Sequence, residues 1–281
     1  MGLYISPAKI AFHLLFCCVP FPCGIILCLI KQTEGDPMKK LYEKNELTFA
    51  LVWIAIYVVS TSLAEALSET IGVYKLVSAV FHLVLAVGLF LWVGRNGLAE
   101  KCGLFLPRYR LSQALFFIPL ELVCLYKLVF SPSLRFSAVE SITFVVSMLC
   151  VGFLEELIFR GFLFMAIEKE NLARAIIISS VTFGIGHIVN LINGQNLLET
   201  VSQIIFAVFV GFALVILFHK GKSLVPCIFF HGVFNALSVV ANDEALNNAL
   251  GGPVPAAVIM IAASAVVLGG YSLWNWKYLN G

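Results

Sequence analysis

Three ionisable side chains lie within six residues of a strongly apolar stretch of the chain. Glu155, Glu156 and Arg160 are preceded by Val-Gly-Phe-Leu and followed by Gly-Phe-Leu-Phe. Glu156 and Arg160 are four residues apart, so on a helix they share a face and can form an ion pair. Glu155 points about 100° away, because an α-helix has 3.6 residues per turn. The ion pair explains Glu156 and Arg160 structurally and leaves Glu155 free for chemistry.

Two further apolar stretches carry a histidine, and one of them also carries an amide. His187 lies in the first, and His231 and Asn235 lie in the second, four residues apart and therefore on one helical face. A single histidine inside a membrane is often only a hydrogen-bond partner between helices. The argument therefore rests on the whole set converging in one bundle. Small residues that would let helices approach closely flank these positions: Gly184, Gly186 and Gly232.

Two carboxylates, two imidazoles and an amide are suited to hydrolysis. A buried carboxylate such as Glu155 can act as a general base near neutral pH. His231 and Asn235 can donate hydrogen bonds to an oxyanion, and each such donor lowers a barrier by roughly 3–4 kcal/mol. No Ser-His-Asp arrangement is evident, and the cysteine nearest to a motif is Cys227. Water is therefore the expected nucleophile.

The same side chains also resemble the ligands of a catalytic zinc ion. One glutamate, here Glu155 or Glu156, with His187 and His231 would leave one coordination position open for water. The helix motif H-E-x-x-H is absent, so any such site would draw its ligands from separate segments. A divalent metal such as zinc remains an alternative, and catalysis without a metal or other cofactor is favoured.

The composition indicates where these residues must lie. Of 281 residues, 60% are hydrophobic and only 12% are charged, against about 25% charged in a soluble domain. The chain is therefore predicted to be an integral membrane protein whose partners are the lipid bilayer and a peptide or protein substrate. Its net charge of +2 says little about partners, and the lack of a basic cluster predicts no nucleic-acid partner.

Nine segments are long and apolar enough to cross a bilayer, which takes about 20 residues. They are approximately 11–30, 47–67, 74–94, 112–131, 140–164, 174–193, 201–218, 223–241 and 254–273. Eight spans are expected if the first segment, which contains prolines, does not cross. No long polar segment separates them. The fold is therefore predicted to be an all-α, polytopic helical bundle, with residues 1–281 forming one membrane domain and the motifs lying in a core at about 140–241.

Loop charges predict the orientation of this bundle. Thirteen of the 18 Lys and Arg residues fall in the loops after spans one, three, five and seven and in the C-terminal tail. Three fall in the opposite loops, and Lys127 and Arg160 lie inside spans. By the positive-inside rule, the N-terminus is outside and the C-terminus is in the cytoplasm. The short loops favour a multi-pass protein of a bacterial plasma membrane.

Together, the three motifs resemble those of a known family. The motifs are Glu155-Glu156-x-x-x-Arg160, Phe183-x-x-x-His187 and His231-x-x-x-Asn235. They are similar to those of the CPBP family, which includes CAAX prenyl proteases of the Rce1 type and bacterial Abi and bacteriocin-processing or immunity proteins. The resemblance covers about residues 140–241, and the order, spacing and placement of the motifs on three spans all agree with it.

The resemblance implies a role for each motif residue. Glu155 would be the general base that activates a water, and His187 would help to hold that water. His231 and Asn235 would donate hydrogen bonds to the oxyanion of the tetrahedral intermediate. The other two residues of the first motif would position Glu155 and brace its helix.

The function predicted from these motifs is that of an intramembrane endopeptidase. Its substrate would be a membrane-associated protein, either of the prenylated CAAX type or a bacterial pheromone or bacteriocin precursor. Two other functions stay open. A non-catalytic bacteriocin-immunity or membrane binding protein could keep the residues as a relic, so substitution of Glu155 would leave its phenotype intact. An ion- or proton-coupled transporter also places Glu and His in the membrane, although no inverted repeat is recognisable.

Overall fold

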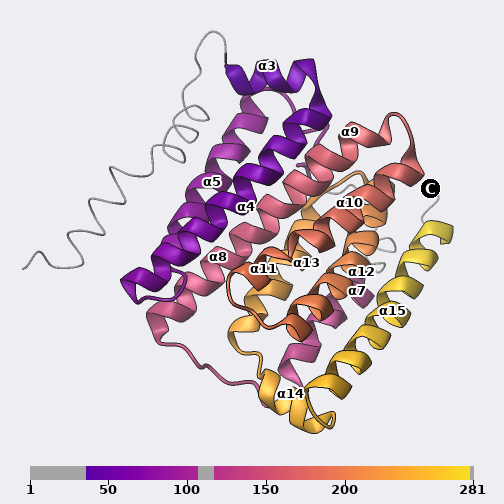
Figure 1. The fold of residues 1–281 in the computed structure, drawn as a ribbon. Helices are drawn as coiled ribbons and strands as arrows, with labels where there is room; N and C mark the ends of the chain where they lie inside the picture. The colour runs from indigo at the N-terminus through magenta and orange to yellow at the C-terminus, as the bar shows by residue number, and fades with distance from the viewer. Residues whose placement is uncertain (1–35, 107–116, 279–281) are drawn as a thin grey trace, which may run out of the picture.

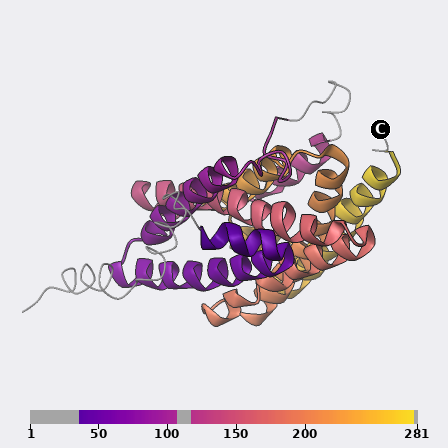
Figure 2. The ribbon, with the colours of Figure 1, turned by 90° about the horizontal axis from the view of Figure 1, so that it is seen from above.

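The computed structural model describes residues 36–106 and 117–278, and nearly all of the secondary structure in these ranges is helical. The helices gather into one bundle, and most of them run up or down its long axis (Figure 1). Seen from above, they lie in more than one layer, so the central helices are covered on several sides (Figure 2). The predicted all-α class is confirmed. The first predicted span, 11–30, lies outside the described residues.

An antiparallel pair of long helices forms one side of the bundle. The short helix α3 (Pro37–Lys44) leads into α4 (Glu46–Ile71), and α5 (Leu76–Arg95) returns beside it. On α4, Phe49, Trp53 and Tyr57 recur every four residues and are buried. This spacing puts the three aromatic rings on one helical face, which packs toward the middle of the bundle.

The central span carries the glutamates. It consists of α8 (Ala138–Glu156), the π-helical segment η3 (Leu157–Phe164) and α9 (Met165–Glu168). Ser137 and Glu140 form a capping box at its start, which satisfies two otherwise unpaired backbone N–H groups. The switch from α to π hydrogen bonding follows Glu156 directly. Such π segments inside α-helices are frequent at functional sites.

The remaining helices enclose the central span. Helix α10 (Leu172–Gly186) breaks at His187 and resumes as the short α11 (Val189–Ile192). Their neighbours are α12 (Leu197–Gly221), α13 (Val225–Ala236), the 3-10 turn η4 (Leu237–Val239), α14 (Asp243–Ala249) and α15 (Pro253–Tyr278). Helices α10, α12 and α15 lie side by side, whereas α13 packs on α8.

The number of spans differs from the prediction. Within 36–106 and 117–278, six helices are long and apolar enough to cross a membrane, or seven if α13, η4 and α14 form one bent span. The predicted spans 112–131 and 223–241 contain shorter helices than expected. The described part of the former is only α7 (Ile118–Cys124) and the 3-10 turn η2 (Leu125–Leu128). In the latter, α13 and η4 cover Val225–Val239, and α14 follows after the predicted end at an angle of 87°. Eight or nine full spans are therefore not confirmed.

Two loops that were predicted to lie on the same side of the membrane lie at the same end of the bundle. Glu46, at the start of α4, pairs with Lys101 at 2.7 Å and with Lys169 at 2.6 Å. These lysines follow α5 and α9, so both basic loops lie at the end where α4 begins (Figure 1). At the opposite end, the carboxylate of Glu140 accepts a hydrogen bond from the backbone N–H of Tyr74. The loops that carry Lys101 and Lys169 therefore share one end.

Close contact between α8 and α13 depends on Gly152. A Cβ atom at Gly152 would lie 2.5 Å from the backbone nitrogen of Gly232, a distance that real Cβ contacts do not show. The predicted close approach at Gly184 is confirmed, because a Cβ there would lie 2.4 Å from Val208. The prediction for Gly186 is wrong, since the nearest atom would be 4.0 Å away. Gly152 lies one turn before Glu156, so it determines how closely the glutamates approach α13.

Candidate active site

A buried ion pair anchors the site. Glu156 and Arg160 are fully buried, and Arg160 Nη1 donates to Glu156 Oε1 at 3.0 Å. The sequence predicted this pair from its spacing, and the structure confirms it. The guanidinium also lies over the ring of Phe183, 4.3 Å from its centre. A buried charge needs such compensation, because neither water nor a distant countercharge can stabilise it.

His231 connects the two glutamates. Its Nδ1 lies 2.8 Å from Glu156 Oε1, and its Nε2 lies 3.5 Å from Glu155 Oε2. The 100° offset of adjacent helical residues places one carboxylate beside each ring nitrogen. Because a neutral imidazole has only one N–H, only the protonated ring can donate to both carboxylates. Donation from Nδ1 to the Glu156 carboxylate fixes the ring so that Nε2 faces Glu155.

Glu155 has a second partner on α4. The hydroxyl of Tyr57 donates to Glu155 Oε1 at 2.8 Å. Tyr57 is buried, whereas the Glu155 side chain keeps 13% of its surface exposed. Glu155 is thus held from two directions and still open on one side. The side chain of Glu156, by contrast, is fully buried.

His187 and Asn235 have no hydrogen-bond partner among residues 36–106 and 117–278, apart from the backbone bonds of their helices. His187 lies at the break between α10 and α11. Its ring and that of Phe183 pack in a T-shaped arrangement, with 5.6 Å between their centres. Phe183 also meets the His231 ring, at 5.5 Å. Asn235 follows His231 by one turn of α13 and is half-buried. Both polar groups are therefore free to bind something else.

Two cavities meet at these free groups. The larger has a volume of about 540 Å³ and the smaller of about 260 Å³. Phe183, His187, Gln203, Asn235 and Ser238 line both of them. His231 opens only to the larger cavity, and Glu155 opens only to the smaller one. The motif residues thus lie between the two cavities. Glu155, the candidate general base, faces the smaller cavity, and His231 faces the larger one.

The smaller cavity is polar over much of its wall. Besides Glu155 it is lined by Tyr57, Thr61, His82 and the Glu65–Lys75 ion pair near the turn between α4 and α5. The imidazole of His82 bonds to Thr61 at 3.1 Å and to Ser147 at 2.9 Å. Hydroxyl, amide and charged groups of this kind can hold water molecules beside a carboxylate.

Several residues of the site were not singled out from the sequence. Tyr57 is one, although its place in the aromatic series at every fourth residue of α4 was a usable signal for an inward-facing hydroxyl. Lys127 was noted from the sequence as a charge inside a predicted span but was given no role; its ammonium donates to the Phe234 carbonyl at 2.8 Å and to the Ser238 hydroxyl. Gln203 lines both cavities and accepts a hydrogen bond from Asn190. Nothing in the local sequence distinguishes Gln203 from any other polar residue near a helix end.

The arrangement does not fit the metal site considered from the sequence. Within the described ranges, no three His, Cys, Asp or Glu side chains are placed to hold one ion. Both ring nitrogens of His231 face carboxylates, and the bond to Glu156 Oε1 fixes Nδ1. His187 would therefore need to approach Glu155 and His231 before the three could share an ion. The geometry instead suits direct activation of water by a carboxylate.

Comparison with known proteins identifies the part of the chain that carries this geometry. Residues 137–237 match the family model for type II CAAX prenyl endopeptidase Rce1-like proteins. No curated protein and no solved structure gave a match. The matched segment begins at the N-cap of α8, ends just after α13, and contains all three motifs. The chain therefore carries, at residues 137–237, a domain of the Rce1-like family of type II CAAX prenyl endopeptidases, as its motifs predicted.

Proposed function

We propose that this protein is an intramembrane endopeptidase in which Glu155 activates a water molecule to hydrolyse a peptide bond of a membrane-associated substrate. The family match supports a protease of the CAAX type. The observation that carries the mechanism is the position of Glu155, which is oriented by Tyr57 and His231 and open to a polar cavity. A general base must lie within hydrogen-bond reach of the proton that it removes, and we infer that the attacking water binds in this cavity beside Glu155.

The proposed reaction uses both cavities. The substrate peptide occupies the larger cavity, and the attacking water lies in the smaller one beside Glu155. Glu155 takes a proton from the water as the oxygen attacks the carbonyl carbon at the shared wall. The protonated ring of His231, which is bonded to Glu156 through Nδ1, donates from Nε2 to the oxyanion together with the Asn235 amide, and His187 helps to hold the water. Glu155 returns the proton to the leaving amine when the carbon–nitrogen bond breaks.

Fixed donors are important in this scheme because they are aligned before the charge develops. The Glu156–Arg160 pair holds His231 through Nδ1, so the ring does not need to reorient during the reaction. Arg160 and Glu156 act through His231 and are positioning residues. A site inside the bundle also excludes bulk water, which strengthens each interaction with the oxyanion.

The substrate class proposed is a prenylated CAAX-type protein or a bacterial pheromone or bacteriocin precursor. We also propose that the protein lies in a bacterial plasma membrane with its basic loops in the cytoplasm. The concentration of basic loops at one end of the bundle supports that orientation.

The deciding experiment is a cleavage assay with the purified full-length protein in detergent or liposomes. A panel of farnesylated CAAX peptides and amphipathic leader peptides is incubated with the unchanged protein, Glu155→Gln and His187→Ala. We expect cleavage by the unchanged protein, loss of at least 100-fold in Glu155→Gln, and a smaller loss in His187→Ala. Glu170→Gln, an exposed glutamate in the turn after α9, is the matched control and should retain full activity.

The outcomes separate the competing functions. Equal cleavage by Glu155→Gln and the unchanged protein would refute the role of Glu155. Ion flux in liposomes without any cleavage would favour a transporter, and binding of a bacteriocin without cleavage would favour an immunity protein. Adding a chelator to the assay tests the metal alternative. Loss of cleavage that zinc restores would show that the reaction needs a metal ion and would contradict activation of water by Glu155 alone.

A further inference from the structure

Lys127 is a buried cation that the proposed mechanism does not use. It lies in η2 and is only 8% exposed. The ion pairs formed by the described residues do not include it. Its neighbours are a backbone carbonyl, a hydroxyl and the ring of Phe234, whose centre is 3.8 Å from Nζ. Removing an ammonium from water is unfavourable by several kcal/mol unless an anion compensates for it.

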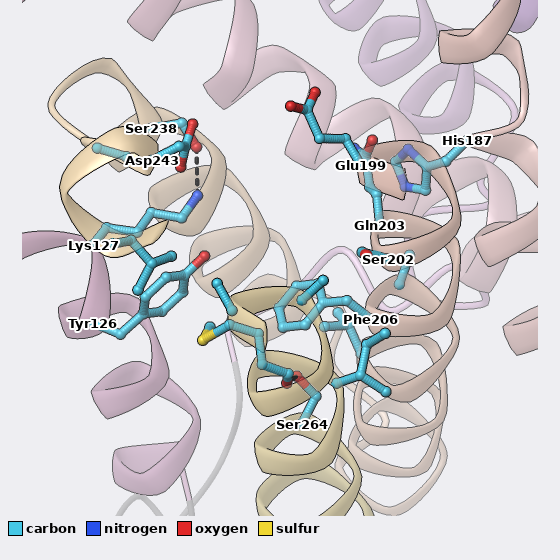
Figure 3. A pocket seen from close by; sticks show the side chains of 18 of the residues that line it. Tyr126, Lys127, His187, Glu199, Ser202, Gln203, Phe206, Ser238, Asp243 and Ser264 are labelled. Atoms are coloured by element: carbon cyan, nitrogen blue, oxygen red, sulfur yellow. Dashed lines mark hydrogen bonds between the residues drawn. The ribbon is translucent and has the colours of Figure 1, made fainter. Parts of the chain in front are cut away.

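The ammonium is directed into the larger cavity. Lys127 lines that cavity with Tyr126, and Figure 3 shows both on the wall opposite His187 and Gln203. An ammonium has three donors, and two of them are accounted for by the carbonyl of Phe234 and the hydroxyl of Ser238. One N–H therefore remains for a ligand in the cavity.

The acidic groups at this cavity form no ion pair with Lys127, although Asp243 lies on the same side of the cavity (Figure 3). Asp243 and Glu199 line it, but the side chain of Asp243 is 76% exposed and lies 3.9 Å from Arg135. Glu199 is exposed as well and lies on the wall of α12. Lys127 is thus the buried positive charge of this cavity, whereas both acidic side chains that line it are exposed, Asp243 beside Lys127 and Glu199 on the opposite wall (Figure 3). An anionic group that enters the cavity would meet its counter-ion there.

Lys127 is also close to the proposed reaction centre. Its two acceptors, on Phe234 and Ser238, lie on either side of Asn235 in the sequence. Ser238 is three residues beyond Asn235, which corresponds to about 5 Å along a helix. An extended peptide covers about 3.3 Å per residue. A group bound to Lys127 would therefore be separated by only a few residues from a peptide bond held at Asn235.

We propose that Lys127 binds the terminal carboxylate of the substrate and is the residue that distinguishes a free C-terminal acid from a C-terminal amide. A carboxylate fits the single available N–H and the short distance to Asn235. The inference rests on the proposed endopeptidase function, because it assigns Lys127 to the same cavity. The carboxylate belongs to the segment that leaves as the new amine, and that segment occupies the part of the cavity beside Tyr126 and Ser238.

The test compares each peptide of the cleavage panel as a free acid and as its C-terminal amide. Binding is measured on full-length Glu155→Gln protein, so that an intact complex is observed, and kcat/KM is measured on protein with Glu155 intact. We expect the amide to bind at least tenfold more weakly than the acid, because a charge-assisted hydrogen bond is lost. The preference should disappear in Lys127→Gln and persist in Lys127→Arg.

Lys101→Gln is the matched control, because Lys101 is a partly buried lysine that lines neither cavity. It should keep the full preference for the acid. Equal binding of acid and amide by protein with Lys127 overturns the proposal, and so does a preference that survives in Lys127→Gln. The comparison on protein with Lys127 intact decides the matter even if Lys127→Gln fails to fold.

These results are separable from those for the proposed function. Cleavage of acids and amides at the same kcat/KM, with equal binding, would leave the endopeptidase intact and remove the carboxylate site. A preference for the acid that depends on Lys127, in a protein that cuts no peptide of the panel, would leave the carboxylate site and refute the proposed function.

Discussion

Glu155 and Glu156 are adjacent and chemically identical, yet their surroundings give them different roles. Glu156 is fully buried and bonded to Arg160 and His231, whereas Glu155 is open to a cavity and bonded to Tyr57. Neighbouring carboxylates with different environments are a common basis for dividing catalytic roles. The offset of the two glutamates was predictable from helix geometry. The partner on α4 was not predicted, because sequence spacing says little about which distant span lies opposite.

The Tyr57 hydroxyl should matter for catalysis more than for folding. Tyr57→Phe removes the donor to Glu155 Oε1 and leaves the ring in place. Because a hydrogen bond to a charged group contributes about 1.5–3 kcal/mol, kcat should fall about 10- to 100-fold while KM changes little. The measurement is steady-state cleavage of the best peptide of the panel. Tyr42→Phe, at another buried tyrosine, is the control; an equal loss there would contradict the assignment.

The Glu156–Arg160 pair should matter for stability as well as activity. Glu156→Gln leaves Arg160 as an unpaired cation at a fully buried position. Breaking a buried pair in this way destabilises by about 3–5 kcal/mol, so the thermal midpoint in detergent should fall. Glu156→Gln combined with Arg160→Met should recover much of the stability without recovering activity, because His231 still lacks its anchor. Recovery of activity in the double variant would show that the anchor is dispensable.

Among the elements, the spans were predicted well where an apolar run forms one straight helix. The predicted spans 47–67, 74–94 and 254–273 agree closely with α4, α5 and α15. Hydropathy does not report bends, so it missed the angle of 87° between α13 and α14. The π segment of the central span was missed for a related reason, since its apolar residues suit an ordinary α-helix equally well. The break at His187 was likewise not visible, although it is what brings His187 to the cavity wall.

The contact between α8 and α13 should be intolerant of even one added methyl group. In Gly152→Ala the new Cβ would lie 2.5 Å from the backbone of Gly232, so the helices must separate. Separation stretches the 2.8 Å contact between Glu156 and His231, and we expect a loss of activity of at least 100-fold, comparable to the effect of a misplacement of about 1 Å. Gly94→Ala on α5 is the control, because nothing lies within 4 Å of its Cβ position. The two variants are compared by cleavage rate and thermal midpoint.

For the whole molecule, the sequence predicted the all-helical class and several helices long and apolar enough to cross a membrane. The number of crossings was not settled, because two apolar stretches form short or bent helices. Which end faces the cytoplasm and whether residues 1–281 form a single domain stay predictions. The loops at the two ends offer exposed positions at which the orientation can be measured.

Orientation can be tested with two single-cysteine positions at opposite ends of the bundle. Glu170 lies in the turn after α9, and Glu244 lies on α14; both are exposed. In a background without reactive native cysteines, Glu170→Cys should react with an impermeant maleimide only after cells are opened. Glu244→Cys should react in intact cells, because α14 lies at the end with few basic residues. The reverse pattern would invert the proposed orientation.

The wall of the larger cavity is built from two different parts of the chain. One part comes from α10, α12 and α13, which belong to the matched family segment, and the other comes from Tyr126, Lys127 and residues of α15 such as Met260 and Ser264, which lie outside it. Selection can therefore act on the two parts separately during evolution. Substitutions in the flanking helices can retarget the protein to a new peptide while its hydrolytic machinery is inherited unchanged, so relatives with identical motifs need not share a substrate.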